Sequence, residues 1–437
     1  MHSHSSSPTW QQTVGKLRSP HWFSLGLVLA LSSLLFFSPL VRSQQPVTIT
    51  VLLQALEIPQ WQPLVDKFEA ENPDIHLEMV EGPNATNLVE DLYTSSFLLG
   101  SSPYDVVYMD IVWVPKFAAA GWLMDLSDRV TEADLRDFME ADVEGGRYQD
   151  KLYRMPLRSD AGMLYYRTDL LKELGRQPPE TFAELVEASQ LAQERGLADW
   201  GYLWQGKQYE GLAAMFVEVL EGFGADWVNP ETLEVGLDQP AAVEATEFLI
   251  STLRDRISPP GVTTYQEDEV RRLFQSGGAL FMRNWPYAWS LGNAEGSQVR
   301  GQFGIKPMVH TTGATSGACL GGWGLGIAQS SPHPDEAWRL IEFFSRADVQ
   351  REFILLNSYV PSRRSLFTDT QIVAKFPHYP ELLKVVESAV LRPPIAQYAQ
   401  ASDILQRYLS AAITGRMTAE DAMQVAAGET RRLLSRI

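Results

Sequence analysis

Three short segments of the sequence combine aromatic side chains with glycine or proline, and these residue types suit the binding of a small ligand. Trp285 precedes a proline, Trp323 follows Gly322, and Tyr398 closes a run that opens with Arg392. Proline limits regular structure, and glycine lets the backbone come close to a ligand. A sugar has apolar C–H faces and an edge of hydroxyl groups, so its site needs flat rings and charged hydrogen-bonding groups. These segments therefore favour a carbohydrate site.

Three acidic residues could bind the hydroxyl edge of such a ligand. Asp110 ends the apolar strand that we expect over residues 105–110, and Glu57 follows a strand that we expect over residues 47–51. In α/β sheets ligands gather beyond the carboxyl ends of the strands, which places both acids near a site. Asp160 is the third candidate. Composition alone supports equally a reading in which half of the rings are core residues and the charges are solvated.

Signals for catalysis are weak in this sequence. The four histidines after residue 43 are scattered, and the sequence has no His-Glu-x-x-His motif, no P-loop and no Gly-x-Ser-x-Gly elbow. We therefore predict no metal site and no cofactor. A glycoside hydrolase needs only two carboxylates, so Asp110 and Asp160 could be its acid and its nucleophile. We favour ligand binding without chemistry, because isolated carboxylates carry little catalytic specificity.

The elements that must position these residues begin in strand–helix–strand order. Residues 47–51 alternate as a strand, residues 61–68 have the apolar spacing of one helical face, and residues 75–79 alternate again. Further helices are expected over residues 337–344 and 418–434. This order predicts an α/β fold with helices packed on a sheet. The body of the chain is longer than one typical core, which predicts two lobes.

The N-terminus indicates the compartment. Residues 1–22 carry Lys16 and Arg18 and no acid, an apolar run extends to Val41, and the sequence then turns polar. This is the pattern of a secretory signal peptide over residues 1–43. An apolar run of about 18 residues could also remain as an uncleaved membrane anchor. In both cases we expect the rest of the chain to lie outside the cytoplasm.

The chain is acidic, with a formal net charge of −18 at pH 7. Nucleic acids favour basic patches, so this charge argues against nucleic acid as a partner. Cys319 is the sole cysteine, which excludes a disulfide within the chain. We expect Cys319 to be a small buried hydrophobe rather than a nucleophile.

Longer motifs carry a family resemblance. The segment from Met155 to Leu171 resembles the first crossing between lobes in family 1 extracellular solute-binding proteins of ABC importers. Within that family, residues 281–286, residues 321–323 and residues 392–398 resemble the trehalose/maltose-binding branch. The similarity follows the order of the family from about residue 47 to the C-terminus.

This resemblance implies a fold and a task. The fold would be of the periplasmic-binding-protein-like type II, with two α/β lobes, a multi-strand hinge and the ligand cleft between the lobes. The N-terminal lobe would comprise residues 47–158 and 309–358, and the C-terminal lobe residues 159–308 and 359–437. The protein would be a periplasmic monomer that captures a neutral disaccharide or similar glycoside. It would present this sugar to the membrane permease subunits of an ABC transporter.

The resemblance also implies a role for each candidate residue. The acids Glu57, Asp110 and Asp160 would accept hydrogen bonds from sugar hydroxyls, Trp285 and Trp323 would stack on sugar rings, the Gly322 backbone would lie against the ligand, and Arg392 and Tyr398 would close the site from the second lobe.

Two departures from the family pattern bear on the identity of the sugar. Arg158 and Ser159 stand where an aromatic residue is common, and residues 81–86 lack an arginine that some disaccharides would require. Trehalose, maltose, sucrose and glucosylglycerol therefore all stay open as ligands. A receptor for a non-sugar solute on the same fold, such as a peptide or a polyamine, is a further alternative.

Overall fold

A computed structural model describes residues 45–100, 102–229 and 232–435. The expected signal peptide or anchor over residues 1–43 lies outside these residues. In the described part of the chain, no helix combines the length and the apolar character that are needed to cross a membrane. The described residues from Pro46 onward form one compact unit, to which the following description applies.

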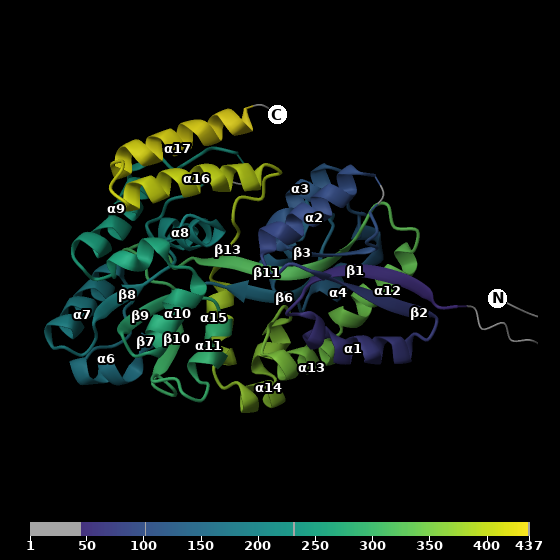
Figure 1. Cartoon of the computed structure of the whole chain (residues 1–437), viewed down its shortest axis with the longest axis horizontal. Helices are drawn as coiled ribbons and strands as arrows, with labels where there is room; N and C mark the ends of the chain where they lie inside the picture. The colour runs from purple at the N-terminus through teal and green to yellow at the C-terminus, as the bar shows by residue number, and fades with distance from the viewer. Residues whose placement is uncertain (1–44, 101, 230–231, 436–437) are drawn as a thin grey trace, which may run out of the picture. The chain divides into compact units, whose positions relative to one another are not determined.

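The first lobe is built on a seven-stranded sheet with the order β12-β6-β11-β3-β1-β2, and β13 pairs with β11 beside this path (Figure 1). Its strands are β1 (Val47–Gln54), β2 (Ile75–Gly82), β3 (Val106–Asp110), β6 (Met155–Ala161), β11 (Ala318–Ile327), β12 (Val360–Pro361) and β13 (Ala389–Val390). β1 is parallel to β2 and β3, whereas β11 is antiparallel to β3 and β6. The three strands predicted near the N-terminus are confirmed.

Helices cover this sheet. They are α1 (Ile58–Glu71), α2 (Thr86–Leu98), α3 (Val114–Ala119), α4 (Glu132–Leu135), α5 (Glu140–Glu144), α12 (Pro334–Ser345) and α13 (Ala347–Asn357), with a small hairpin of β4 (Arg147–Tyr148) and β5 (Lys151–Leu152). Two of these helices, α1 and α12, have the apolar faces that the sequence predicted. Trp61, Leu64, Val65 and Phe68 of α1 are all buried, as the helical spacing predicted. On α12 the buried side includes Ala337, Leu340, Ile341 and Phe344.

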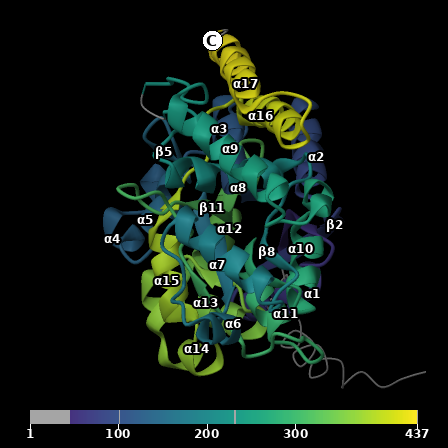
Figure 2. The same cartoon turned by 90° about the vertical axis from the view of Figure 1, so that its left-hand side faces the viewer.

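The second lobe contains a four-stranded sheet with the order β10-β7-β9-β8. Its strands are β7 (Met163–Arg167), β8 (Trp200–Leu203), β9 (Ala279–Asn284) and β10 (Phe303–Lys306), and its helices are α6 (Thr168–Leu174), α7 (Phe182–Glu194), α8 (Glu210–Gly222), α9 (Pro240–Arg254), α10 (Glu267–Gln275), α11 (Tyr287–Gly292), α16 (Tyr398–Ile413) and α17 (Ala419–Leu434). Figures 1 and 2 both show α16 and α17 side by side. Thr418 caps α17 by accepting a hydrogen bond from the backbone N–H of Asp421, which confirms the predicted C-terminal helix.

A third apolar cluster joins the two sheets. It contains residues of β6 and β12 together with residues of β7, β9 and β10. The helices α14 (Thr370–Lys375) and α15 (Tyr379–Glu387) pack into the same cluster. The chain therefore passes between the sheets several times, and the α/β class predicted from the sequence is confirmed. The residue bounds of the lobes given above remain a prediction.

Gly162 forms the first crossing between the sheets, directly between β6 and β7. A Cβ atom at this position would lie 1.7 Å from Glu218 Oε1 and 2.2 Å from Arg283 Nη2. Glu218 and Arg283 form an ion pair without solvent exposure, and Glu218 also accepts a hydrogen bond from the backbone N–H of Cys319. The crossing therefore requires glycine. The Cys319 side chain is buried, as predicted.

Candidate functional site

A cavity of about 750 Å³ brings together seven of the eight predicted site residues: Asp110, Asp160, Trp285, Gly322, Trp323, Arg392 and Tyr398. Elements of the first lobe supply Asn84, Asn87, Glu90, Asp110, Trp113 and Lys116, whereas elements of the second lobe supply Tyr209, Glu210, Glu267, Trp285, Tyr287 and Tyr398. Both lobes therefore contribute to one cavity.

Strand register places four of these residues side by side. Trp323 of β11 pairs with Asp110, the last residue of β3. On the other side of β11, Gly321 pairs with Asp160 and Gly322 with Ser159 of β6. β11 therefore lies between the two strands that carry Asp110 and Asp160. Its glycines at this point place no side chain between the two acids.

Gly322 is the one cavity residue whose backbone requires glycine. Its φ angle is +118°, and a Cβ atom would lie 2.7 Å from the carbonyl oxygen of Arg158. A β-bulge follows immediately between Trp323 and Gly324. Bulges change the direction of a side chain relative to a regular strand. The bulge therefore lies directly beside Trp323, at the point where this residue lines the cavity.

Trp323 belongs to the core of the first lobe as much as to the cavity. Its side chain is only 7% exposed. Its ring centroid lies 4.7 Å from that of Tyr108 and 5.3 Å from that of Trp113. These contacts fix the orientation of the ring, so Trp323 offers a rigid and largely buried edge to the cavity.

Trp285 lies at the bend between β9 and α11, next to the proline, Pro286, that limits regular structure there. The Arg283 guanidinium lies 4.1 Å from the centroid of the Trp285 ring, and Trp285 Nε1 donates to Glu267 Oε1 at 3.3 Å. Gly321 lies against the ring edge, because a Cβ atom there would be 3.4 Å from Trp285 Cζ3. Trp285 is therefore held in position by both lobes of the cavity wall and remains partly exposed.

Arg392 is the centre of a charged network on the cavity wall. Its Nη1 donates to Glu210 Oε1 at 2.8 Å, and its Nη2 donates to Asp110 Oδ1 at 3.3 Å. The hydroxyls of Tyr398 and Ser402 also donate to Glu210. Sequence reasoning missed Glu210 because the residue begins a helix, α8, in a segment without a recognisable motif.

Asp160 is a cavity acid with a raised pKa. Burial raises the pKa of its carboxyl to about 7, and the nearby Arg158 guanidinium acts in the opposite direction. Its Oδ1 accepts a hydrogen bond from the backbone N–H of Ala161 at 3.1 Å. A group with an unusual pKa in a cavity is a candidate for function, and a partly protonated carboxyl can both donate to and accept from a hydroxyl.

Glu57 is the predicted site residue that does not line the cavity. It is 6% exposed, and its Oε1 accepts from Arg158 Nη2 at 2.6 Å. Arg158 Nε also donates to the Tyr108 hydroxyl at 3.0 Å, and its guanidinium lies 4.4 Å from the centroid of the Tyr359 ring. The arginine that departs from the family pattern therefore supplies the partner of Glu57.

Several polar residues of the cavity were not predicted. Asn84 lies before α2, in the loop that the sequence singled out only for its missing arginine, and Asn87 is the second residue of α2. Lys116 donates to Glu90 at 2.9 Å and to Thr94 at 3.1 Å. Single polar residues at helix starts carry no periodic signal, so only the fold reveals their common location. Among residues 45–435, with the two internal gaps, no group of three or more potential metal ligands occurs.

Comparison with known proteins gives consistent results. The profile of bacterial extracellular solute-binding proteins matches residues 54–351. A probable ABC transporter-binding protein from Deinococcus radiodurans is 32% identical over 368 residues, which cover 82% of this chain and 87% of that protein. A maltotriose-binding protein from Pyrococcus abyssi is 23% identical over 330 residues, which cover 73% of this chain and 67% of that protein.

A solved structure gives the same assignment. T. maritima MalE3 with bound maltose matches with a TM-score of 0.80 and 36% sequence identity, covering 89% of this chain and all of that chain. The predicted two-lobed fold of the periplasmic-binding-protein-like type II is thereby confirmed. The relatives are named as binding proteins, which weighs against the glycoside hydrolase. The chain is a member of the bacterial extracellular solute-binding protein family.

Proposed function

We propose that this protein is the substrate-binding component of an ABC sugar transporter and that its 750 Å³ cavity binds a neutral disaccharide or similar glycoside. The observation that carries this proposal is the convergence of Asp110, Asp160, Trp285, Trp323 and Arg392 on one cavity. Small-molecule sites have volumes of about 300–1,000 Å³ and combine apolar walls with a few well-placed polar groups. The cavity has both properties.

The polar groups of the cavity suit a ligand rich in hydroxyl groups. Of its five acids, Asp110 and Glu210 share the cation Arg392, Glu90 is paired with Lys116, and Glu267 accepts a hydrogen bond from Trp285 Nε1. Burial keeps the pKa of Asp160 near 7, so this carboxyl is not a full negative charge at neutral pH. Hydroxyl groups suit the arrangement, because they can donate to the acids and accept from Arg392 and Lys116.

The relatives support an α-glucoside among the possible sugars. T. maritima MalE3, at 36% identity, was solved with maltose. We propose maltose or trehalose ahead of sucrose and glucosylglycerol, with Trp285 and Trp323 as the surfaces for the sugar rings. Asp110, Asp160, Arg392 and Tyr398 would bind the hydroxyls, and Gly322 would allow the close approach of the backbone.

The proposal includes the cellular setting. The protein would be exported to the periplasm, would act as a monomer, and would pass the sugar to membrane permease subunits after its lobes close around the ligand. Residues 1–43 would be a cleaved signal or, alternatively, an inner-membrane tether. The mass of the protein recovered from membrane and soluble fractions would separate these two states.

Calorimetry of the mature protein with trehalose, maltose, sucrose and glucosylglycerol tests the proposal, with the sugar recovered afterwards and analysed by chromatography. We expect at least one of these sugars to bind and to be recovered intact. Turnover of the sugar would instead identify a glycoside hydrolase. Absence of binding to all four sugars, together with binding of a polyamine or peptide, would assign the cavity to a non-sugar solute.

A further inference from the structure

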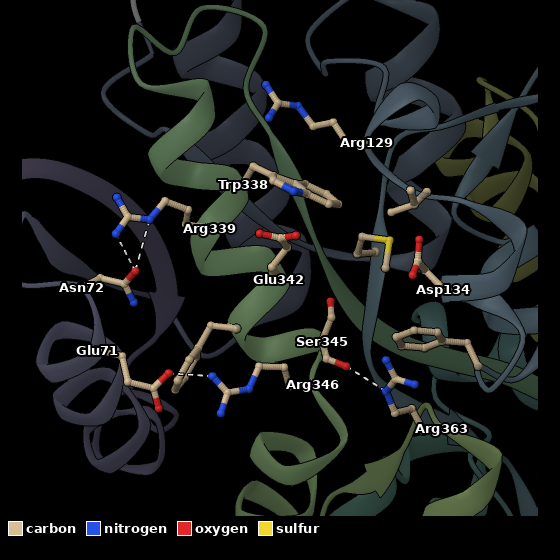
Figure 3. Close-up of a pocket in the computed structure, with 14 residues that line it drawn as sticks. Glu71, Asn72, Arg129, Asp134, Trp338, Arg339, Glu342, Ser345, Arg346 and Arg363 are labelled. Atoms are coloured by element: carbon tan, nitrogen blue, oxygen red, sulfur yellow. Dashed lines mark hydrogen bonds and ion pairs between the residues drawn. The ribbon is translucent and has the colours of Figure 1, made fainter.

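A second open cavity, of about 540 Å³, lies on the first lobe and shares no lining residue with the proposed sugar cavity. Its walls come from the C-terminal end of α1, the segment before and within α4, the first residue of β6, and one face of α12 (Figure 3). Phe138, Met155 and Phe343 supply apolar surface. The cavity is a separate candidate for the recognition of a partner, and its charged residues indicate which chemical group it would bind.

The arginines around this cavity are already engaged. Arg129 pairs with Asp335 at 2.8 Å, Arg339 with Asp74 at 2.7 Å, Arg346 with Glu71 at 2.6 Å, and Arg363 with Asp137 at 3.2 Å. Arg339 also donates to Asn72, and Arg363 donates to the carbonyl oxygen of Ser345. An arginine with a carboxylate partner offers little to a further anion. The cavity is therefore not an anion site, despite its four guanidinium groups.

One carboxylate of the cavity, that of Glu342, has no hydrogen-bonded or ion-paired partner within the described chain. The Glu342 side chain makes no hydrogen bond or ion pair with any described residue. Figure 3 shows its carboxylate between Trp338 and Arg346, with no dashed line to a neighbour. Asp134 lies across the cavity (Figure 3) and is already compensated: its Oδ2 accepts from the backbone N–H and the hydroxyl of Thr131, at 2.8 and 2.7 Å, and these bonds together with the Arg363 charge lower its pKa.

Trp338 places an aromatic surface next to the free Glu342 carboxylate. The two residues are four apart on α12, so their side chains are neighbours on the same helix face. The Arg129 guanidinium lies near one side of this ring, 5.8 Å from its centroid. A flat cation that contacts both an indole and a carboxylate is the guanidinium of arginine, which stacks on aromatic rings and binds carboxylates through paired donors.

We propose that this cavity, formed around Trp338 and Glu342, receives an arginine side chain presented by a partner protein. The acidic chain, with its net charge of −18, complements a basic partner surface and would steer it toward the protein. Under the function proposed above, that partner is an extracytoplasmic segment of the transporter's membrane subunits. Only the name of the partner rests on that function, because the preference for arginine follows from the cavity itself.

Titration with N-acetylarginine methylamide, followed through the indole N–H signal of Trp338 in the NMR spectrum, tests the proposal. The Trp338→Phe variant assigns the signal. We expect the arginine probe to shift the Trp338 signal in a saturable way. The matched citrulline probe, which has the same shape without the charge, should bind at least about fivefold more weakly. Glu342→Gln should weaken binding of the arginine probe by about fivefold.

Glu336→Gln is the matched control, because Glu336 lies on the same helix outside the cavity lining. It should leave the binding of the arginine probe unchanged. Equal binding of the citrulline and arginine probes, preference for an N-acetylglutamate probe, or equal effects of the two glutamine variants would overturn the proposal. Sugar affinity measured on the same samples reports the other cavity. If the wild-type protein binds the arginine probe but none of the sugars, the proposed function is contradicted. If it binds a sugar but not the arginine probe, this inference is contradicted.

Discussion

Arg392 and Asp110 form an ion pair, with 3.3 Å between Arg392 Nη2 and Asp110 Oδ1, where the segment before α16 meets the end of β3. Through Nη1 the same guanidinium binds Glu210 of α8 at 2.8 Å. One side chain thus connects an acid of the first lobe with an acid of the second. All three residues line the proposed sugar cavity, so a bound ligand must share or displace these contacts.

Replacement of Arg392 with methionine, Arg392→Met, tests this connection. The variant keeps an aliphatic stem but leaves Asp110 and Glu210 without their cation. We expect calorimetry to show sugar affinity reduced by about tenfold or more, ~1.4 kcal/mol. Breaking a buried charge pair should also lower the free energy of unfolding by ~3–5 kcal/mol. Arg407→Met on the exposed side of α16 is the control, and unchanged affinity in Arg392→Met would remove Arg392 from the site.

Replacing either tryptophan should weaken sugar binding, but the two replacements should lower the stability of the protein by different amounts. We expect Trp285→Ala and Trp323→Ala each to weaken sugar affinity by about tenfold or more. Trp323 packs against Tyr108 and Trp113, so its removal should also lower the free energy of unfolding by about 3–5 kcal/mol. Trp285 is partly exposed, and its removal should cost less. Wild-type affinity in both variants would place these rings outside the ligand contacts.

Glu57→Gln should separate a structural role from a binding role. Because Glu57 is paired with Arg158 and does not line the cavity, we expect sugar affinity to stay within about twofold of wild type. The melting temperature should fall, because removal of one member of a buried ion pair costs ~3–5 kcal/mol. A large loss of affinity at unchanged stability would restore the hydroxyl-binding role that the family resemblance implied.

Asp160 should make stability depend on pH. Its pKa of about 7 in the folded protein lies above its ordinary value of 3.8, so the folded chain holds this proton more tightly than the unfolded chain. The stability gained from the protonated carboxyl is complete below the unfolded pKa and is lost as the pH rises toward about 7. Thermal melts of Asp160→Asn should therefore lose less stability than wild type over this range. Asp91→Asn on exposed α2 is the control, and parallel curves for Asp160→Asn and wild type would contradict the raised pKa.

Gly162→Ala should disrupt the crossing between the sheets. The new Cβ atom would lie within 1.7 Å of Glu218 Oε1 and would press on the buried Glu218–Arg283 pair. Overpacking of this kind costs about 1–3 kcal/mol or more in the free energy of unfolding, measured with urea. Gly428→Ala on α17 is the matched control, because the nearest atom there, Arg432 Nη1, is 3.8 Å away. That substitution should stabilise the helix by roughly 0.5–1 kcal/mol.

The sequence predicted those parts of the fold that have strong periodic signals. The strand at residues 47–51, the apolar face of α1 and the apolar face of α12 all follow from local spacing, and each is confirmed. Local spacing also placed Asp110 at the end of its strand. It could not show that Trp323 pairs with Asp110, because 213 residues separate them and the contact exists only through the sheet register.

The contact that Glu57 makes does not follow from local spacing. Its position just after β1 predicted a site at the carboxyl end of the sheet, and the residue does lie there. Its carboxylate is paired with the Arg158 side chain of β6, with 2.6 Å between Arg158 Nη2 and Glu57 Oε1. Glu210 shows the opposite case, because its importance comes only from Arg392, Tyr398 and Ser402, which lie more than 180 residues away along the chain. Neither contact leaves a trace in local spacing.

The position of β11 in the first sheet has a consequence for folding. This strand pairs with β3 on one side and with β6 on the other, yet it is the eleventh strand in chain order. The edges of β3 and β6 therefore stay unpaired until residue 327 has emerged during synthesis. Such long-range pairing slows folding and leaves strand edges open to aggregation. A chain truncated before β11 should therefore not complete the sheet of its first lobe.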